Sequence, residues 1–328
     1  MNCRPTLLIP ALVLSGMMTA CGGGATESQP PAAQSNQVIT TQLPGFPHAV
    51  TFCVPAGATR AIVALHGGGG NSSAIASQLA LNSSAAATTT ATVNWTWLSA
   101  NKVMLVLPQG QHIDGSSGAT TWSNYAMTSG QDDKAFLQAL AAKLRTTYGL
   151  AHITLMGHSM GGTMANRMWC ESPSTFNAYV SLAGPASSQF QQAATPCACT
   201  LGSATPPYLG VFGDADSVMQ TSGNWTKPNW YIDPVVVWAG NAAFQNGTMI
   251  GEWHQHSDRV LQVCGTTLDL DGYVNTGNVD TWTSCGGKLV LKRVRGADHG
   301  VDAIAARMNP ASPTVVMDSV MAFLATQN

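Results

Sequence analysis

The alternation of short apolar runs with helical patterns is the feature that most constrains how this chain folds. Six apolar runs each predict a buried strand, and most continue into a glycine-rich turn that carries polar residues. They span residues 61–70, 102–110, 152–159, 178–184, 208–216 and 288–300. Residues 132–149 and 313–327 predict helices, the second beginning at Pro313. This alternation predicts a mostly parallel sheet with helices on both faces, in which ligands bind beyond the carboxyl ends of the strands.

Composition limits the partners of the chain. Charged residues make up 9% of the 328 residues, the net charge is −2, and no run of basic residues occurs. Average proteins contain about 25% charged residues. A chain of this kind is not expected to bind nucleic acid, and its uncharged polar surface suits a neutral substrate. Residues 43–328 are of a length that suits one large α/β domain.

The first 42 residues predict export and a tether. Residues 1–20 have the pattern of a signal peptide, with Arg4 followed by an apolar run too short to span a bilayer. Residues 18–21, Met-Thr-Ala-Cys, resemble a bacterial lipobox, which predicts lipidation of Cys21 and anchoring to the outer membrane or cell surface. Ordinary secretion is the alternative. Residues 21–42 are rich in Gly, Pro, Ser, Gln and Ala and predict a flexible tether.

The stretch GHSMGG places Ser159 between Gly157 and Gly161, after a predicted strand and before a helical pattern. A serine hydroxyl is a poor nucleophile unless a base removes its proton during attack. On a strained strand-to-helix turn, small neighbours relieve crowding around the serine, and the helix N-terminus points its positive end at the reacting centre. A short motif of this kind occurs by chance, so the rest of the chain has to supply the partners of Ser159.

A base and an acid occur in a workable order after Ser159. His299 follows the last predicted strand, where a catalytic base is expected. The acid is expected after the strand that begins at residue 208, where both Asp214 and Asp216 are found. Asp298 is badly placed to reach the ring of its sequence neighbour His299. The order Ser, Asp, His is that of α/β-hydrolases.

A glycine-rich segment follows the first strong strand and supplies a candidate oxyanion hole. In LHGGGGN the glycines allow main-chain N–H groups to approach a substrate oxygen without interference from side chains. We expect the N–H groups of Gly68 and Met160 to be the two donors.

Residues 218–256 interrupt the alternation and carry many aromatic residues among Asn, Gly and Pro. We interpret this segment as an irregular insertion over the active edge of the sheet, forming a lid or an aromatic platform for substrate. His254 and His256 near its end are interpreted as polar loop or pocket residues, since H-x-H alone is a weak zinc signal. No metal or other cofactor is expected. The expected substrate contacts are His66, His158, Trp230 and Trp253.

Six cysteines follow Cys21, and an even number in an exported protein favours disulfides. Spacing alone does not determine how they pair. The six are Cys53, Cys170, Cys197, Cys199, Cys264 and Cys285.

From about Thr51 to His299 the chain resembles the secreted α/β-hydrolase esterases that include polyhydroxybutyrate depolymerases and feruloyl and acetylxylan esterases. The resemblance is carried by TFCVPAGATRAIVALHGGGGN, LSANKVMLVLPQG, the helix-elbow-strand segment from residue 132 to 184, and VFGDAD. The family has His-Gly-Thr-x-Asp where this chain has VFGDAD, which selects Asp216 as the acid. The resemblance also implies a Cys264–Cys285 bridge.

By the same resemblance Cys170 pairs with Cys197 or Cys199. The chain departs from the family around the base, where the usual Gly-His-x-Trp-Pro-Gly is replaced by Asp298-His299-Gly300-Val301. Its aromatic insertion is also longer than the family's.

The resemblance implies the α/β-hydrolase fold and a serine esterase that hydrolyses polyhydroxybutyrate or its oligomers through an acyl-enzyme. Feruloyl or acetylxylan esterase activity is the nearest alternative. Cutinase-like polyester hydrolysis is another, because GHSMGG is also the elbow of bacterial cutinases. The lack of a separate polymer-binding module favours oligomers or soluble esters over crystalline polymer. An alternative of a different class is a lipid-anchored binding protein that keeps the fold without catalysis.

Overall fold

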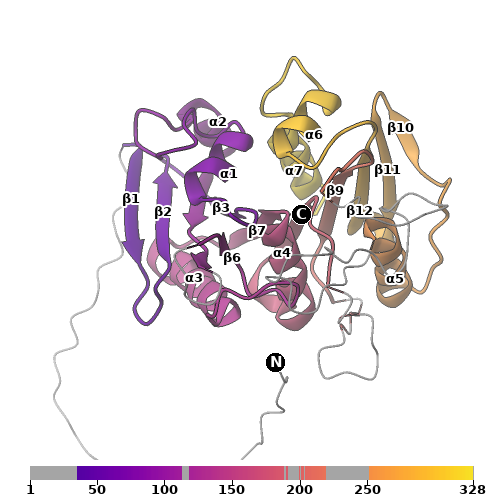
Figure 1. Ribbon diagram of the computed structural model, residues 1–328, viewed down its shortest axis with the longest axis horizontal. Helices are drawn as coiled ribbons and strands as arrows, with labels where there is room; N and C mark the ends of the chain where they lie inside the picture. The colour runs from indigo at the N-terminus through magenta and orange to yellow at the C-terminus, as the bar shows by residue number, and fades with distance from the viewer. Residues whose placement is uncertain are drawn as a thin grey trace, which may run out of the picture.

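The computed structural model describes residues 35–112, 118–187, 190, 199, 201–202, 204–218 and 251–327, and these residues form one twisted sheet covered by helices (Figure 1). The sheet contains ten strands. They are β1 Gln37–Gln42, β2 Ala49–Val54, β3 Arg60–Leu65, β4 Val103–Pro108, β7 His152–His158, β8 Ala178–Leu182, β9 Tyr208–Gly213, β10 Val274–Thr276, β11 Val279–Ser284 and β12 Leu289–Val294. A separate pair, β5 Gln111–His112 and β6 Thr120–Thr121, lies outside this sheet.

The strand order across the sheet is β1-β2-β4-β3-β7-β8-β9-β12-β11-β10. The six strands from β4 to β12 in this order pair in parallel, and they are the six that the apolar runs predict. The predicted mostly parallel sheet is therefore confirmed. The two strands at each edge pair antiparallel, and the alternation with helices does not predict them.

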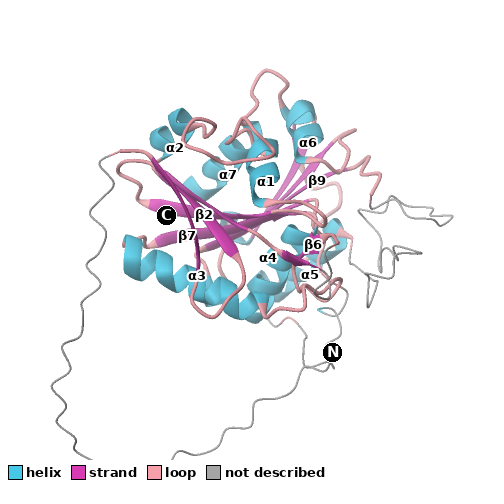
Figure 2. Cartoon of the chain, turned by 60° about the vertical axis from the view of Figure 1, so that its left-hand side comes forward, coloured by secondary structure: helices cyan, strands magenta, loops and turns pink. Residues whose placement is uncertain are grey.

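Helices cover both faces of the sheet, as predicted (Figures 1 and 2). On one face lie α1 Ser72–Gln78, α2 Trp95–Asn101, α6 Val301–Met308 and α7 Val315–Ala325. On the other lie α3 Asp133–Tyr148, α4 Met160–Glu171 and α5 Glu252–Cys264. The described residues also include short 3-10 helices at Pro173–Thr175 and Cys285–Gly287. Among the described residues, no helix is both long and apolar enough to cross a membrane.

Burial on both faces explains why the central strands are continuous apolar runs. In β3, Ile62 packs in the cluster that includes the α1 and α7 side chains, and its neighbour Val63 packs in the cluster that includes those of α3 and α4. Successive side chains of a strand point to opposite faces, so a strand covered on both sides favours apolar residues at consecutive positions.

The predicted tether over residues 21–42 extends too far. Gln37–Gln42 is strand β1, paired antiparallel with β2 from Gln37↔Val54 to Gln42↔Ala49. Most of its side chains are exposed, because it is an edge strand, and an edge strand needs no apolar run. The polar composition of β1 therefore gave no sign of a strand in the sequence. The predicted signal peptide and Cys21 lie outside the described residues.

The predicted irregular insertion over residues 218–256 is wrong at its end. Helix α5 begins at Glu252, so His254 and His256 lie on a helix and not in a loop. The apolar side chains that attach α5 to the sheet, Val260 and Val263, come later in the helix. They lie beyond the aromatic segment that dominates the sequence pattern. Residues 219–250, with Trp230, lie outside the described residues.

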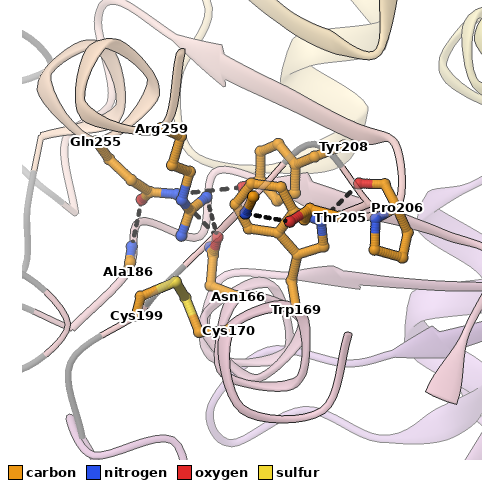
Figure 3. Close-up of a disulfide and its surroundings, with 11 residues drawn as sticks. Asn166, Trp169, Cys170, Ala186, Cys199, Thr205, Pro206, Tyr208, Gln255 and Arg259 are labelled. Carbon is orange, nitrogen blue, oxygen red and sulfur yellow. Dashed lines mark hydrogen bonds between the residues drawn. A yellow bond between two sulfur atoms is a disulfide. The ribbon is translucent and has the colours of Figure 1, made fainter. Parts of the chain in front are cut away.

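Within the described residues, two disulfides join distant parts of the chain. Cys264 at the end of α5 pairs with Cys285, with Cα atoms 5.5 Å apart, which confirms that predicted bridge. Cys170 at the end of α4 pairs with Cys199, with Cα atoms 4.9 Å apart (Figure 3). Of the two partners expected for Cys170, Cys199 is the observed one, and the assignment of this bridge to Cys197 is wrong. Cys197 itself lies outside the described residues, and Cys53 is a buried free thiol.

Candidate active site

Ser159 lies at the turn between β7 and α4, in a main-chain conformation that serine seldom adopts. Its φ is 52° and its ψ is −121°, and only 8% of the residue is exposed. The Ser159 N–H donates to the carbonyl oxygen of Leu182 in β8 (2.9 Å), and the Ser159 carbonyl accepts from Thr163 N–H (2.9 Å). Positive φ in a non-glycine residue is strained, and such strain gathers at functional sites.

The glycines around Ser159 are required by close packing. A Cβ atom on Gly157 would lie 2.2 Å from the carbonyl carbon of Gly161. A Cβ atom on Gly161 would lie 2.5 Å from the carbonyl oxygen of Leu65. The first turn of α4 therefore crosses β7 and β3 so closely that neither position accepts a side chain. The spacing of the motif follows from this crossing.

The structure brings His299 and Asp216 together. His299 lies in the turn between β12 and α6, Asp216 follows β9, and His299 Nδ1 lies 2.7 Å from Asp216 Oδ2. A carboxylate only accepts hydrogen bonds, so Nδ1 carries the hydrogen. The other candidate acid, Asp214, instead accepts a hydrogen bond from Gly296 N–H (2.6 Å). The choice of Asp216 over Asp214 agrees with this arrangement.

The glycine-rich segment lies against the turn that carries Ser159. A Cβ atom on Gly67 would be 3.2 Å from Ser159 Cβ, and one on Gly68 would be 3.2 Å from Met160 Cγ. The two residues expected to donate to an oxyanion, Gly68 and Met160, are therefore neighbours. Met160 directly follows Ser159, and Gly67, which precedes Gly68, lies against Ser159. Met160 is the first residue of α4, where main-chain N–H groups have no acceptor within the helix.

His66 is buried and shapes the glycine-rich segment. The residue is 1% exposed. Its Nε2 accepts from Gly110 N–H (2.9 Å), so the hydrogen is on Nδ1, which donates to the Gly67 carbonyl oxygen (2.7 Å). Burial lowers the pKa of His66 to about 4, so the ring is neutral at neutral pH. Both ring nitrogens are thus occupied by main-chain groups, and contact of His66 with substrate stays a prediction.

Sequence reasoning missed the segment that supports this site. Trp122 Nε1 donates to the His66 carbonyl oxygen (2.9 Å), and Asn124 Nδ2 donates to the Met160 carbonyl oxygen (2.9 Å). Both residues are fully buried. Their stretch, TTWSNYAM, has no strand or helix period, and its one signal is a tryptophan, whose N–H needs an acceptor when buried.

Two other expected substrate contacts, His158 and Trp253, lie in different parts of the structure. His158 is 7% exposed, and its ring lies 4.9 Å from the ring of His299 between centroids. Trp253, near the start of α5, is half-buried and packs against a cluster formed by Phe212, Trp282 and Leu291. Contact of Trp253 with substrate stays a prediction, as does that of Trp230.

Helix α5 packs against α4 through a buried polar network (Figure 3). Asn166 of α4 accepts at Oδ1 from Gln255 Nε2 (2.8 Å) and from Arg259 Nη1 (2.7 Å). The Arg259 guanidinium lies over the rings of Trp169 and Tyr208, 4.5 and 4.8 Å from their centroids, and burial lowers its pKa. These contacts fix α4, the helix that begins directly after Ser159, from the side of α5.

The start of α5 also lies near the His299–Asp216 pair. Burial, and then the charge of Asp216, raise the pKa of the Glu252 carboxyl group to about 8. His254 pairs with Asp258 on the same helix (3.4 Å), and His256 is buried. The described residues contain no group of three or more His, Cys, Asp and Glu side chains that could hold a metal ion.

Comparisons with known proteins support the architecture. A family described as alpha/beta hydrolase fold matches residues 113–195, which include Ser159. An acetyl xylan esterase from Aspergillus awamori has a TM-score of 0.53 at 14% identity, over 89% of this chain and 99% of that chain. The chain has the α/β-hydrolase fold.

A second similar structure is an S-formylglutathione hydrolase from Agrobacterium tumefaciens. It has a TM-score of 0.52 at 12% identity, over 89% of this chain and 95% of that chain. At these identities the likeness shows the fold alone. A search of the curated proteins found no match to the sequence.

Proposed function

We propose that this α/β-hydrolase is a serine ester hydrolase in which Ser159, His299 and Asp216 form a catalytic triad. The observation that carries the proposal is the His299 Nδ1–Asp216 Oδ2 hydrogen bond of 2.7 Å at the sheet edge where Ser159 sits on a strained turn. The three residues follow β7, β9 and β12, so they gather at the carboxyl ends of the parallel strands, where this class of sheet binds ligands.

In the proposed reaction, Ser159 Oγ attacks the ester carbonyl carbon while His299 Nε2 takes the hydroxyl proton. The Nδ1–H to Asp216 bond holds the ring in the tautomer that leaves Nε2 free of hydrogen. The N–H groups of Gly68 and Met160 stabilise the oxyanion. His299 then protonates the leaving alkoxide, and water attacks the acyl-enzyme by the same steps in reverse order.

For the substrate we propose a hydroxyalkanoate ester or a short polyester oligomer. This rests on the resemblance of the sequence motifs to polyhydroxybutyrate depolymerases and on the low charge of the chain. Feruloyl or acetylxylan ester hydrolysis is the rival, because the same motifs occur in those esterases and one similar structure is an acetyl xylan esterase. Cutinase-like polyester hydrolysis is the third candidate.

We also propose that the protein is exported and attached to a membrane through lipid on Cys21, with ordinary secretion as the alternative. Its partners would then be an ester substrate and the membrane, and no nucleic acid. A binding protein without catalysis is disfavoured, because such a protein would gain nothing from the strained serine and the hydrogen-bonded His299–Asp216 pair.

The test compares the purified full chain with Ser159→Ala. A fluorophosphonate probe should label the first and not the second. Both proteins are then assayed on hydroxybutyrate oligomers, methyl ferulate, acetylated xylan oligomers and p-nitrophenyl butyrate. Turnover of the hydroxybutyrate oligomers that is lost in Ser159→Ala supports the substrate proposed here. Turnover of ferulate or xylan esters alone favours the rival. Absence of both labelling and turnover would leave the binding protein as the better account.

A further inference from the structure

His158 lies beside Ser159, His299 and Gly67 in the proposed catalytic centre. It is the last residue of β7 and directly precedes Ser159. Its Nε2 lies 2.9 Å from the main-chain carbonyl oxygen of His299, and the two imidazole rings are 4.9 Å apart between centroids with a tilt of 50°. On its other side runs Gly67, where a Cβ atom would lie 3.3 Å from His158 Nδ1.

The direction of the His158–His299 hydrogen bond is determined by chemistry. A carbonyl oxygen only accepts, so His158 Nε2 carries the hydrogen and donates it. Burial, and then the nearby charge of His299, lower the pKa of His158 to about 4. The ring therefore stays neutral, with its single hydrogen on Nε2, while His299 takes up and releases protons. It acts as a fixed donor and does not compete for the proton in transfer.

A second contact fixes the same turn from its other end. Asp298 Oδ1 accepts from Ser217 N–H (2.7 Å) and Ser217 Oγ–H (2.8 Å). Ser217 directly follows Asp216, so this contact ties the residue before His299 to the residue after Asp216. The His158 contact ties His299 to the residue before Ser159. The His299 turn is thus joined on one side to the neighbour of Ser159 and on the other side to the neighbour of Asp216.

We propose that His158 is a positioning residue that fixes His299 relative to Ser159 through the hydrogen bond from its Nε2–H to the His299 carbonyl oxygen. This inference rests on the proposed function. It replaces the expectation that His158 contacts substrate. Without the His158 contact, the turn would keep its tie to Ser217 but lose its tie to the serine side. Small displacements of a catalytic group cost rate steeply, about 100-fold for 1 Å.

Two substitutions separate the hydrogen bond from the shape of the ring. His158→Phe keeps a flat ring without a donor, and His158→Gln keeps an N–H donor at the distance of Nε2. The matched control is His152→Gln, at the exposed first position of the same strand. For each variant, active sites are counted with a fluorophosphonate, and kcat and KM are measured on p-nitrophenyl butyrate per counted site, beside the melting temperature.

We expect His158→Phe to lower kcat by roughly 10- to 100-fold with KM nearly unchanged. We expect His158→Gln to retain kcat within about fivefold of the wild type, and His152→Gln to match the wild type. If His158→Phe does not fold, His158→Asn replaces it with the same expected loss, because its shorter amide does not reach the carbonyl oxygen.

A kcat of the donor-free variant equal to that of the wild type overturns the inference. So does an equal loss in His158→Gln, which would mean that the ring and not its hydrogen bond matters. A wild type that fails to react with the fluorophosphonate refutes the proposed function itself. A wild type that reacts, with a fully active His158→Phe, refutes only the role of His158.

Discussion

Two His–Asp pairs in the described part of the chain have nearly the same hydrogen-bond length but lie in different surroundings. His48 Nε2 lies 2.6 Å from Asp133 Oδ1, and His299 Nδ1 lies 2.7 Å from Asp216 Oδ2. The side chains of the first pair are completely buried, whereas those of His299 and Asp216 are 12% and 7% exposed. The first pair joins the start of β2 to the start of α3, far in sequence from Ser159.

The surroundings of the buried pair assign it a structural role. The His48 ring stacks on Phe136, with centroids 3.9 Å apart. Asp133 Oδ2 accepts from Ser129 Oγ–H (2.6 Å) and Ser123 N–H (2.5 Å), so it gathers donors from the segment that supports the glycine-rich turn. A short His–Asp hydrogen bond therefore does not mark a catalytic site by itself. The second pair differs in its residual exposure, and it follows strands whose carboxyl ends lie on the same side of the sheet as the strained turn of Ser159.

The largest expected effect separates the two pairs by activity. Asp216→Asn leaves the shape of the pair but no longer favours the tautomer of His299 with hydrogen on Nδ1, and we expect kcat on p-nitrophenyl butyrate to fall about 10⁴-fold. The free energy of unfolding, measured by urea titration, should change little. Asp214→Asn, two residues away, is the control. Equal losses in both variants would contradict the assignment of Asp216.

The second effect is a loss of stability with little loss of activity, at the buried His48–Asp133 pair. Asp133→Asn weakens three hydrogen bonds to a buried carboxylate, and we expect the free energy of unfolding to fall by about 3 kcal/mol. The kcat per fluorophosphonate-reactive site should stay within a few-fold of the wild type. Asp132→Asn is the control, because Asp132 caps α3 through Ala135 N–H and asparagine caps a helix equally well. A large loss of kcat with unchanged stability would give this pair a catalytic role.

The site was predictable where chemistry imposes a local motif. Gly157 and Gly161 are required by the crossing of α4 over β7 and β3, and that requirement leaves a pattern in the sequence. The His48–Asp133 pair joins residues 85 positions apart with no such pattern. Asn124 likewise meets Met160 through folding alone. Supports of this kind come from tertiary packing and leave no local spacing to recognise.

The fold was predictable in its centre and not at its edges. Central strands such as β3 and β4 must be apolar on both faces, and this continuous pattern identifies them. The edge strands β1 and β10 are mostly exposed, so their composition does not differ from that of a loop. Helix α5 was missed for another reason, since its buried side is largely polar, with Gln255, His256 and Arg259.

The third effect is the pH dependence of stability that comes from three buried histidines without a carboxylate partner. Two of them hydrogen-bond to main-chain groups, and the third has no hydrogen-bond partner among the described residues. The pKa is lowered from 6.5 to about 4 in His66 and His158, and to about 3 in His256. Below pH 6.5 these histidines bind protons in the unfolded chain but stay unprotonated in the native protein. The contribution of each histidine to the free energy of unfolding is therefore complete above that pH. It is lost as pH falls toward 4, by about 1.4 kcal/mol per pH unit.

This pH dependence is measured by urea unfolding at pH 7, 6 and 5. His256→Leu removes one of the three groups, so the free energy of unfolding should fall less steeply with acid in the variant, by about 1.4 kcal/mol per pH unit. Identical slopes in the two proteins would mean that His256 takes up its proton in the native state.

The smallest effect is the change in the free energy of unfolding that His256→Leu causes at pH 7. The sign of this change shows whether the imidazole is hydrogen-bonded. His256 is buried, and neither ring nitrogen has a hydrogen-bond partner in the described part of the chain. It borders a small cavity whose lining includes Val211 and Leu291 and also the polar residues Ser181, Tyr208, Glu252 and Gln255. Leaving a buried polar group unpaired costs roughly 1–3 kcal/mol, so we expect leucine to raise the free energy of unfolding by about 1 kcal/mol.

The control for this variant is His254→Leu, two residues earlier in α5, where the ring pairs with Asp258 and is partly exposed to solvent. There we expect a change within about 0.5 kcal/mol. A clear loss of stability in His256→Leu would mean that its imidazole is hydrogen-bonded in solution. His256 would then resemble His48, a buried histidine whose hydrogen bond stabilises the fold, and the contrast between partnered and unpartnered histidines would apply only to pKa and not to stability.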